Sequence, residues 1–466
     1  MKKLKLEKYL EKIQLRRKVE TNHIAPTKMY KLTVVIPVYG EHEYIGKTLH
    51  FLSANSCNYL DKTLVLLVIN NPVEGANIDY VEENQYLLRE LKNGFFQEKC
   101  LSFGQSPSIL SSEKQLSFEL KTLDNPSLNP LLGGDQKRVG DEHQASSIEH
   151  SVSKKSQLNR LNLAWIDASS NGRELPGRGG VGMARKLGMD SVLNFLSWDN
   201  DPIIISLDAD TLVEKNYLAA IECFFYEHKD IAAASVNFKH LPGKTPEEEK
   251  AIREYEYSIR YYVESLKRAG SPYAYYSIGS AMVCRADAYI RAGGMKQHRG
   301  GEDFYFMQGL RKLGPIMEIT DTKVYQSARP SDRVPFGTGP KVQKCLNGTE
   351  LKLYNSKIFD VLKETLQMIE NWINAEDVTD LRQFVDFLPE EANDYFNSLK
   401  FYLIWPNILK NNVKGCKELS INDRKRLLWA FHVWFDAFKT LKFIHYLERN
   451  YPKTYSKTDI AYIDVT

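Results

Sequence analysis

Hydrophobic and polar residues follow two alternating patterns along much of the chain. Short continuous apolar runs, closed by Pro, Gly or charged residues, are typical of strands buried on both faces. Such runs occur in KLTVVIPVYGE from Lys31, TLVLLVINNP at 63–72, LNLAWIDAS from Leu161 and PIIISL from Pro202. Segments such as EHEYIGKTLHFLSA and YVEENQYLLRELKNG lie between them and have helical spacing. This alternation predicts βαβ units, a mostly parallel sheet and an α/β fold.

A long helix is predicted for KTPEEEKAIREYEYSIRYYVESLKRAG. Thr245 is its expected cap, with Pro246 and Glu248 in the first turn. Its apolar positions fall on one face, which predicts burial of that face. These positions are Ile252, Tyr255, Ile259, Val263 and Leu266. Further along, AYYSIGSAMVCR reads as a strand and GEDFYFMQGLRKLG as a helix.

Three segments differ from the α/β pattern of residues 31–345. Residues 1–30 are basic and predict a solvated amphipathic helix, with contact to a membrane surface or polyanion as the alternative. Residues 97–158 are rich in Ser, Asn and Gln and predict a long, partly disordered insertion. Residues 346–466 have a helical pattern and predict a separate C-terminal region.

Composition excludes several classes of protein. A hydrophobic content of 43% over 466 residues supports a sizeable core. None of the six cysteines lies at CxxC spacing, which argues against a zinc ribbon or a thiol redox motif. We find no signal peptide, no run of about 18 apolar residues and no nucleic-acid motif. We therefore expect a cytoplasmic protein without a membrane span or a nucleic-acid partner.

Two carboxylates follow the most apolar strand directly, in the segment PIIISLDADTLV. Ligands of open parallel sheets bind at the carboxyl ends of the strands. Residues two apart in an extended segment point to the same side, so Asp208 and Asp210 can face one ligand. Because like charges repel, a divalent cation between or beside them would stabilise the pair, and oxygen ligands favour Mg²⁺ or Mn²⁺. The alternative is that the triplet caps a turn.

Three other stretches offer phosphate-binding or acid–base groups. GRGGVGMARKLGMD places glycines before a helix that carries Arg185, a pattern that suits a diphosphate or a plain tight turn. RGGEDFYF places Glu302 and Asp303 at a helix start, as a general base or as simple caps. QSARPSDRVPFGTGPK carries Arg329 and Arg333 and predicts a basic loop over a leaving phosphate, or an ordinary solvated loop.

These motifs together resemble family 2 glycosyltransferases with the nucleotide-diphospho-sugar transferase (GT-A) fold. VVIPVYGEHEYIGKTL resembles the nucleotide-holding first strand, GVGMARKLGMD the G-x-x-x-A-R-N-x-G helix, and SLDADTLV the D-x-D strand. SIGSAMVCRADAYIRAGGM resembles the acceptor segment, and GGEDFYFMQGLRKLG the E-D helix, with Leu310 and Arg311 in exchanged order. The ordered set covers most of residues 31–345.

The resemblance implies a role for each matched position. It implies that Asp210 ligates Mn²⁺ or Mg²⁺ and that Asp208 contacts ribose or metal. It implies that Asp303, with Glu302 beside it, deprotonates the acceptor hydroxyl. The donor-binding residues that it implies are Pro37, Val38, Tyr39, Glu41, Arg185 and Asp208. The sequence itself adds Asn70 at the end of the second strand and Arg329 and Arg333 of the basic loop as predicted donor-binding residues. The implied acceptor-binding residues are Gly279 and Ser280.

The chain departs from the family pattern in three places. Asn70-Asn71 stands where family members often carry an acid that reads the base, and an amide both donates and accepts, so UDP and GDP stay open. Lys186 stands where Asn is usual. Gln326 and Arg329 have the spacing of the processive synthases' Q-x-x-R-W, but Pro330 replaces the Trp, which argues against a polymer synthase.

The sequence thus predicts a metal-dependent, inverting sugar transfer with Asp303 as base. A retaining transferase and a non-catalytic sugar-binding or scaffold protein are the alternatives. The expected acceptor is a glycan, a lipid-linked or a small-molecule hydroxyl, as in cell-envelope glycan biosynthesis. An apolar stripe after Arg424, Lys425 and Arg426 predicts packing onto the catalytic domain or within a helical bundle, with docking to the inner membrane face or dimerisation as the alternative. The stripe consists of Leu427, Leu428, Phe431, Trp434, Phe435, Phe438 and Leu441.

Overall fold

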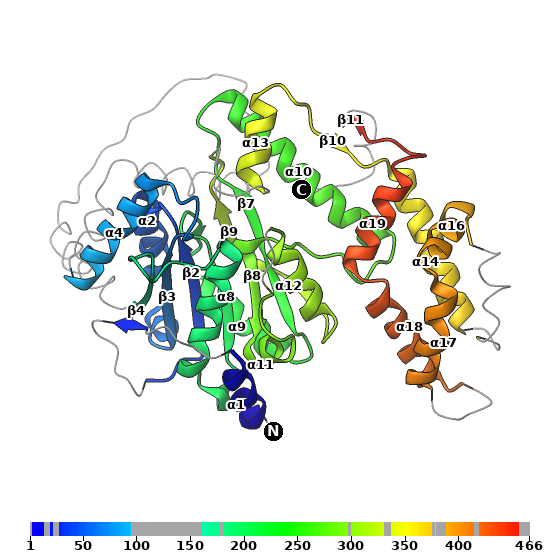
Figure 1. Cartoon of the computed structure of the whole chain (residues 1–466), viewed down its shortest axis with the longest axis horizontal. Helices are drawn as coiled ribbons and strands as arrows, with labels where there is room; N and C mark the ends of the chain where they lie inside the picture. The colour runs from blue at the N-terminus through cyan, green and yellow to red at the C-terminus, as the bar shows by residue number, and fades with distance from the viewer. Residues whose placement is uncertain are drawn as a thin grey trace, which may run out of the picture.

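The computed structural model has a twisted β-sheet covered by helices, with a group of C-terminal helices beside it (Figure 1). This is the α/β class that the sequence predicts. The predicted insertion at 97–158 and Arg333 lie outside the residues that the structure describes. Those residues are 2–13, 19–21, 28–94, 161–177, 180–296, 300–329, 337–374, 378, 388–413 and 419–455.

The four strands expected from apolar runs are present and pair in parallel. β2 (Leu32–Val38) lies between β3 (Thr63–Asn70) and β5 (Ile203–Ser206), and β4 (Asn162–Ala168) pairs with β3. Every residue of β2, β3 and β5 is buried, as strands covered on both faces require. Because these strands are parallel, their carboxyl ends lie at one edge of the sheet.

The rest of the sheet is mixed, with the order β1-β4-β3-β2-β5-β8-β7-β9-β6. β8 (Met282–Arg285) runs antiparallel between β5 and β7 (Ala233–His240), and β7 pairs in parallel with β9 (Ile316–Gln326). The short strands β1 (Glu20–Thr21) and β6 (Leu212–Val213) are antiparallel to β4 and β9.

The strand predicted for AYYSIGSAMVCR is too long. Residues 279–281 form a 3-10 turn, and strand β8 begins only at Met282. This turn brings Gly279 and Ser280 to the carboxyl edge of the parallel strands, where both residues line a cavity.

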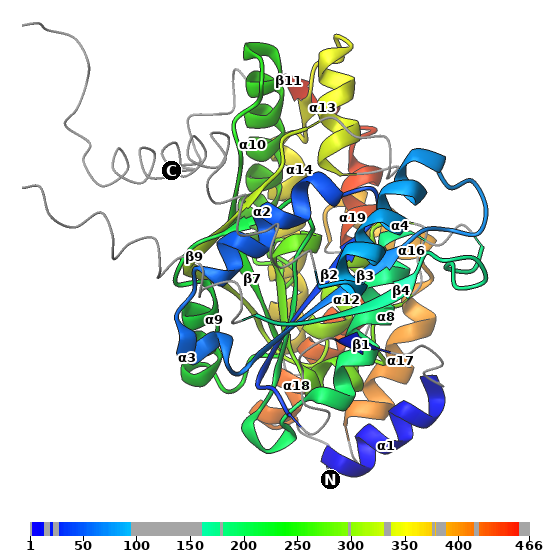
Figure 2. The ribbon, with the colours of Figure 1, turned by 90° about the vertical axis from the view of Figure 1, so that its left-hand side faces the viewer.

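Helices cover both faces of the sheet. One core contains side chains of α2 (His42–Ser53), α4 (Ile78–Lys92) and α9 (Tyr217–Glu227). The other contains side chains of α8 (Val181–Val192), α11 (Ala286–Arg291) and α12 (Glu302–Arg311). In Figure 2, α9 and α8 lie on opposite sides of the strands. Helix α8 approaches the sheet closely, because a Cβ atom on Gly188 would lie 2.3 Å from Cγ1 of Val35.

The C-terminal helices share an aromatic core with the sheet domain. They are α14 (Ser356–Asn374), α16 (Glu390–Ser398), α17 (Phe401–Asn412), α18 (Ile421–Trp434) and α19 (Ala437–Leu447). Tyr261 and Leu266 of the long helix α10 (Pro246–Arg268) belong to this core, so α10 joins the two parts of the chain. Thr245 caps α10 as predicted, by accepting from the backbone N–H of Glu248.

The apolar stripe of the last segment packs inward. Leu427, Phe431 and Phe435 are fully buried in the aromatic core, which confirms the bundle-packing interpretation for them. The stripe is interrupted after Trp434, and Asp436 caps the next helix by accepting from the backbone N–H of Lys439. Among the described residues, no helix combines the length and apolarity that a membrane span requires.

The basic N-terminal segment differs from the single solvated helix expected over residues 1–30. Helix α1 spans Lys2–Ile13, and Glu20 and Thr21 already pair with β4. Tyr9 is buried against the domain, where its hydroxyl donates to Asp190 over 2.7 Å. Tyr289 donates to the same carboxylate, so α1 is attached to α8 and α11 by buried hydrogen bonds.

Candidate active site

A cavity of about 900 Å³ opens at the carboxyl ends of the parallel strands. It contains residues from β2, β3, the segment after β5, α8, the 3-10 turn, α12 and the end of β9. Most of the sequence-predicted site residues line this one cavity. They are Pro37, Tyr39, Glu41, Asn70, Arg185, Asp208, Asp210, Gly279, Ser280, Glu302, Asp303 and Arg329.

The buried Arg185 connects two of the predicted motifs. Its guanidinium donates to Asp208 after β5 and to Glu302 at the start of α12, each over 2.5 Å. Only 4% of Arg185 is exposed. Burial alone would lower the pKa of Arg185, but Asp208 and Glu302 outweigh it and raise that pKa. Arg185 therefore stays charged and holds the two acidic segments together.

Two glycines make room for this arrangement. A Cβ atom on Gly279 would lie 2.3 Å from Nη2 of Arg185, and one on Gly182 would lie 2.6 Å from Cγ of Glu302. Both distances are shorter than a carbon atom tolerates. The glycines of the GVGMAR and SIGSA segments thus permit close approach between α8, the 3-10 turn and α12.

Asp303 has the environment of a general base. It lies in the first turn of α12 and its Oδ1 accepts from the backbone N–H of Phe304 over 2.8 Å. Burial and the neighbouring Glu302 raise the pKa of Asp303 to about 6, and Arg185 opposes this shift. A carboxylate with a pKa near 6 is ionised at neutral pH and is more basic than an ordinary aspartate.

Arg329 forms a second charged cluster in the cavity lining. Its guanidinium pairs with Glu41 and lies 3.1 Å from Asp210. It also lies over the ring of Tyr44, 3.9 Å from the ring centroid. Burial opposes the charge, but Asp210 and Glu41 raise the pKa of Arg329. Each aspartate of the D-x-D segment thus has an arginine beside it. The sequence analysis predicted a divalent metal ion beside these two carboxylates.

Asn70 lies at the end of the cavity formed by β2 and β3. Its side-chain amide donates to the backbone carbonyls of Val38 and Val68, each over 3.0 Å. Both N–H donors are therefore used within the protein, and the amide oxygen is the group left for a ligand. Asn71 is directed elsewhere and accepts a hydrogen bond from Ser169.

Some predicted residues do not contribute side chains here. Val38 is buried in the hydrophobic core rather than in the cavity. Its contribution is the backbone carbonyl that holds Asn70, because the pleat of β2 directs its side chain away. Lys186, one residue after Arg185, pairs with Asp190 at 2.7 Å and does not line the cavity.

Sequence reasoning missed several lining residues. Tyr255 and Ile259 of α10 were interpreted as core, but they line the cavity together with Ser277 and Ile278. Gln326 also lines it and donates to Ser280 over 2.6 Å. Helical periodicity identifies the apolar face of α10, but it cannot distinguish a face that meets a core from one that borders a cavity.

The donor set at this site fits a cation that is held jointly with a substrate. Within the described ranges, no three His, Cys, Asp or Glu side chains group so that they could hold a metal ion alone. Asp208 and Asp210 supply two carboxylates, and Mg²⁺ is usually bound by one or two carboxylates together with substrate phosphates. The residues present therefore fit a metal–diphosphate complex.

No protein-family model and no curated protein matches the chain. Solved structures similar to it include residues 1–349 of TarS from S. aureus in complex with UDP-GlcNAc. That structure is 12% identical, with 87% of this chain and 91% of TarS 1–349 covered and a TM-score of 0.35. Another is the mannosyltransferase PcManGT from Pyrobaculum calidifontis with GDP-Man and Mn²⁺, at 13% identity, 93% and 95% coverage and a TM-score of 0.34. At these TM-scores, the function of this chain has to be argued from its own site.

Proposed function

We propose that this protein is a glycosyltransferase that moves a sugar from a nucleotide-diphospho-sugar to an acceptor hydroxyl. The observation that carries the proposal is the junction made by Arg185. It joins Asp208 of the D-x-D segment to Glu302, which directly precedes Asp303, at the rim where parallel sheets bind ligands. A group that activates an acceptor and groups that face a donor diphosphate thus share one cavity.

The donor occupies the end of the cavity near β2, β3 and α8. The proposed donors are UDP- and GDP-sugars, and the amide oxygen of Asn70 would accept from the ring N–H that uracil and guanine both carry. The amino end of α8 lines the cavity at residues 180–182, and backbone N–H groups at a helix start attract phosphate. Arg329 adds a positive charge close to Asp210.

In the proposed reaction, Asp303 removes the proton of the acceptor hydroxyl. The acceptor oxygen forms a bond to the anomeric carbon of the sugar, while the bond from that carbon to the diphosphate oxygen breaks. The nucleoside diphosphate leaves with the bonding electrons, and Asp303 holds the proton. General-base assistance of this kind contributes about 10²–10⁴ in rate. One displacement inverts the anomeric centre.

Asp210 and Asp208 would hold Mn²⁺ or Mg²⁺, which when bound neutralises charge on the leaving diphosphate. The protein's own part is to keep those carboxylates facing the diphosphate. Arg185, which is almost fully buried in the cavity lining, does this for Asp208 by donating to its carboxylate.

Calorimetric binding of UDP, GDP, CDP and dTDP, each with and without Mn²⁺, tests the proposal. We expect metal-dependent binding of UDP or GDP to the wild type and its loss in Asp210→Ala. Asp360→Ala is the matched control, since Asp360 is a solvent-exposed carboxylate on α14. If no nucleotide binds under any metal condition, the proposal is wrong and a scaffold role becomes the better explanation.

Product analysis tests the stereochemistry. The protein is incubated with α-linked UDP- and GDP-sugars and a panel of glycoside acceptors, and the new linkage is assigned by NMR. A β-linked product agrees with the inverting mechanism. An α-linked product contradicts it and identifies a retaining transferase of the same donor class.

A further inference from the structure

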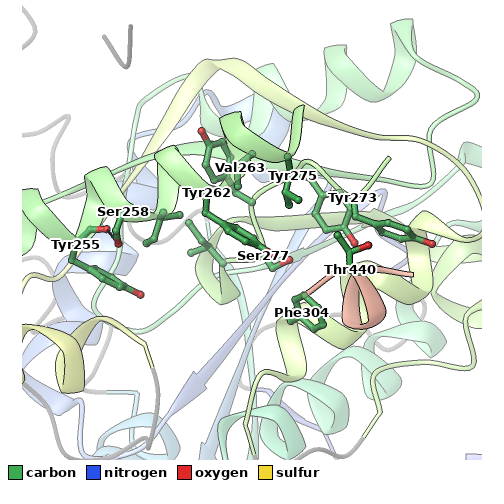
Figure 3. A pocket seen from close by; sticks show the side chains of 14 residues that line it. Tyr255, Ser258, Tyr262, Val263, Tyr273, Tyr275, Ser277, Phe304 and Thr440 are labelled. Atoms are coloured by element: carbon green, nitrogen blue, oxygen red, sulfur yellow. Dashed lines mark hydrogen bonds between the residues drawn. The ribbon is translucent and has the colours of Figure 1, made fainter. Parts of the chain in front are cut away.

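A second cavity, of about 310 Å³, lies between the sheet domain and the C-terminal helices. Figure 3 shows its walls: Tyr255, Ser258, Tyr262 and Val263 from α10, and Phe304 and Thr440 from the two facing helices. The segment with Tyr273, Tyr275 and Ser277 closes it from the remaining side. Its volume is at the lower end of the range for small-molecule sites, about 300–1,000 Å³.

This aromatic cavity adjoins the candidate active site. Tyr255, Ile259, Ser277 and Ile278 line both cavities. Phe304, in the aromatic cavity, directly follows Asp303, which lines the active-site cavity. A molecule bound in the aromatic cavity would therefore lie beside the active-site cavity and against Phe304, whereas Asn70 lines the active-site cavity and not the aromatic one.

The lining is uncharged and mostly apolar, with several hydroxyl groups. None of its fourteen residues is Asp, Glu, Lys, Arg or His. Five of them are tyrosines, at positions 255, 262, 273, 275 and 276, and Phe304 adds another aromatic ring. Aliphatic hydroxyls come from positions 258, 277 and 440, and the aliphatic side chains are at positions 259, 263, 266, 278 and 437. Such a surface offers ring faces and hydroxyl groups and provides nothing to balance a phosphate or carboxylate.

One buried group in this lining has no partner. Within the part of the chain that the structure describes, the hydroxyl of Tyr275 is buried and makes no hydrogen bond. Its neighbour Tyr273 donates to the carbonyl of His432 over 2.7 Å. An unsatisfied buried hydroxyl is unfavourable and uncommon in folded proteins. Tyr275 lines the cavity, so a polar ligand that reaches its hydroxyl would supply the missing partner.

We propose that the aromatic cavity binds an uncharged sugar ring of the acceptor and directs one of its hydroxyls toward Asp303. A pyranose ring fits this lining because it has an apolar C–H face for the tyrosine rings and a rim of hydroxyls for Tyr275 and the serines. The proposal rests on the proposed function and specifies its acceptor as a neutral glycoside. An acceptor with a charged group at this position is disfavoured, since no side chain of the lining would neutralise it.

Photolabelling of the full chain tests the location directly. The probe is a methyl glucoside that carries a small diazirine, and the labelled peptides are mapped by mass spectrometry. We expect labels on residues 255–278 and around Phe304, and we expect competition by methyl glucoside, methyl mannoside or methyl N-acetylglucosaminide. Glucose 6-phosphate and glucuronate should not compete. Labels confined to other surfaces, or equal competition by the charged sugars, would overturn the proposal.

Binding measurements with variants separate this inference from the proposed function. Tyr275→Phe removes the unpartnered hydroxyl and should weaken methyl glycoside binding about three- to tenfold, the effect of one hydrogen bond. Nucleotide binding should be unchanged. Tyr226→Phe, at a tyrosine that is 70% exposed, is the matched control and should change neither. Intact nucleotide binding with an unchanged glycoside affinity in Tyr275→Phe would refute the inference alone; absent nucleotide binding would refute the proposed function.

Discussion

Arg185 donates to Glu302 over 2.5 Å, although 117 residues separate them in the sequence. Glu302 is buried at the first position of α12, and its neighbour Asp303 faces the cavity. The ion pair therefore fixes the start of α12 relative to α8. It also places a positive charge near Asp303 and limits how far the pKa of this aspartate rises.

Removal of the Arg185 guanidinium should affect both stability and acidity. Without it, Glu302 and Asp208 face each other without a balancing charge, and breaking a buried pair in this way costs about 3–5 kcal/mol. We expect Arg185→Ala to lower the free energy of unfolding by that amount in denaturant titrations. The acid limb of the pH–rate profile should also move to higher pH, because Arg185 lowers the pKa of Asp303.

Arg291→Ala is the control for this experiment. Arg291 lies 3.6 Å from Asp287 on the exposed face of α11, and pairs of this kind contribute about 0–1 kcal/mol. A similar loss of stability in both variants would contradict a structural role for the Arg185 pair.

The glycine beside Arg185 should not tolerate a side chain. Gly279→Ala places a methyl group 2.3 Å from Nη2 of Arg185, so the guanidinium must move away from Asp208. We expect a loss of nucleotide binding in calorimetry. Gly309→Ala is the matched control: its methyl group would be 4.0 Å from Cβ of Ala292, and alanine stabilises a helix by roughly 0.5–1 kcal/mol over glycine. If Gly279→Ala binds nucleotide as the wild type does, the close approach of Gly279 to Arg185 is not required for nucleotide binding.

The sequence was sufficient to predict the parallel half of the sheet. β2 and β3 are buried along their whole length, and their continuous runs of apolar residues predict this burial from the sequence alone. Strand β7 was missed, because its sequence AASVNFKH has small and polar residues and lacks such a run. The antiparallel insertion of β8 depends on contacts between distant segments, which periodicity does not encode.

The candidate site was predictable where chemistry is local and not where it is shared between elements. The D-x-D pair at a strand end predicts a metal or ligand site, and the E-D pair at a helix start predicts a general base or helix caps. That Arg185 joins them, or that Arg329 lies beside Asp210, depends on which elements the fold brings together. In the same way, the apolar face of α10 predicts burial, but the cavity beside Tyr255 and Val263 exists only because the C-terminal helices approach α10.

Metal binding should depend on the nucleotide. Asp208 and Asp210 each have an arginine beside them, and the described residues form no metal cluster of their own. We expect Mn²⁺ alone to bind weakly and Mn²⁺ with UDP or GDP to bind much more tightly, since diphosphate oxygens complete the coordination. Electron paramagnetic resonance of Mn²⁺ measures both, with Asp360→Asn as the control for Asp210→Asn. Tight Mn²⁺ binding without nucleotide would show that the protein forms a closed metal site by itself.

The acidity of Asp303 should respond to its neighbour Glu302. Glu302 raises the pKa of Asp303, so Glu302→Gln should lower it. Because the base acts in its ionised form, wild-type kcat/KM should fall as the pH drops through about 6. In Glu302→Gln, this acid limb should move to lower pH. A pH–rate profile with an unchanged acid limb would contradict the assignment of Asp303 as the base.

The same pKa shift predicts that Asp303 reduces stability at neutral pH. The ordinary pKa of 3.8 applies to the unfolded chain and a pKa of about 6 to the folded one. Between these values the unfolded chain releases a proton that the folded chain retains, so this aspartate's contribution to stability falls as the pH rises and then levels off. Asp303→Asn removes the ionisation and should therefore stabilise the protein by about 1–3 kcal/mol at pH 8 and by much less near pH 4.

Thermal denaturation at the two pH values measures this difference. Asp360→Asn is again the control, because it makes the same substitution at a carboxylate that is 67% exposed. The asparagine variant at position 303 should combine a higher melting temperature at pH 8 with a loss of turnover. An equal effect at both pH values would mean that the gain comes from packing or hydrogen bonding. In that case the ionised Asp303 carboxylate would not be what destabilises the wild type, and the raised pKa of Asp303 would not be supported.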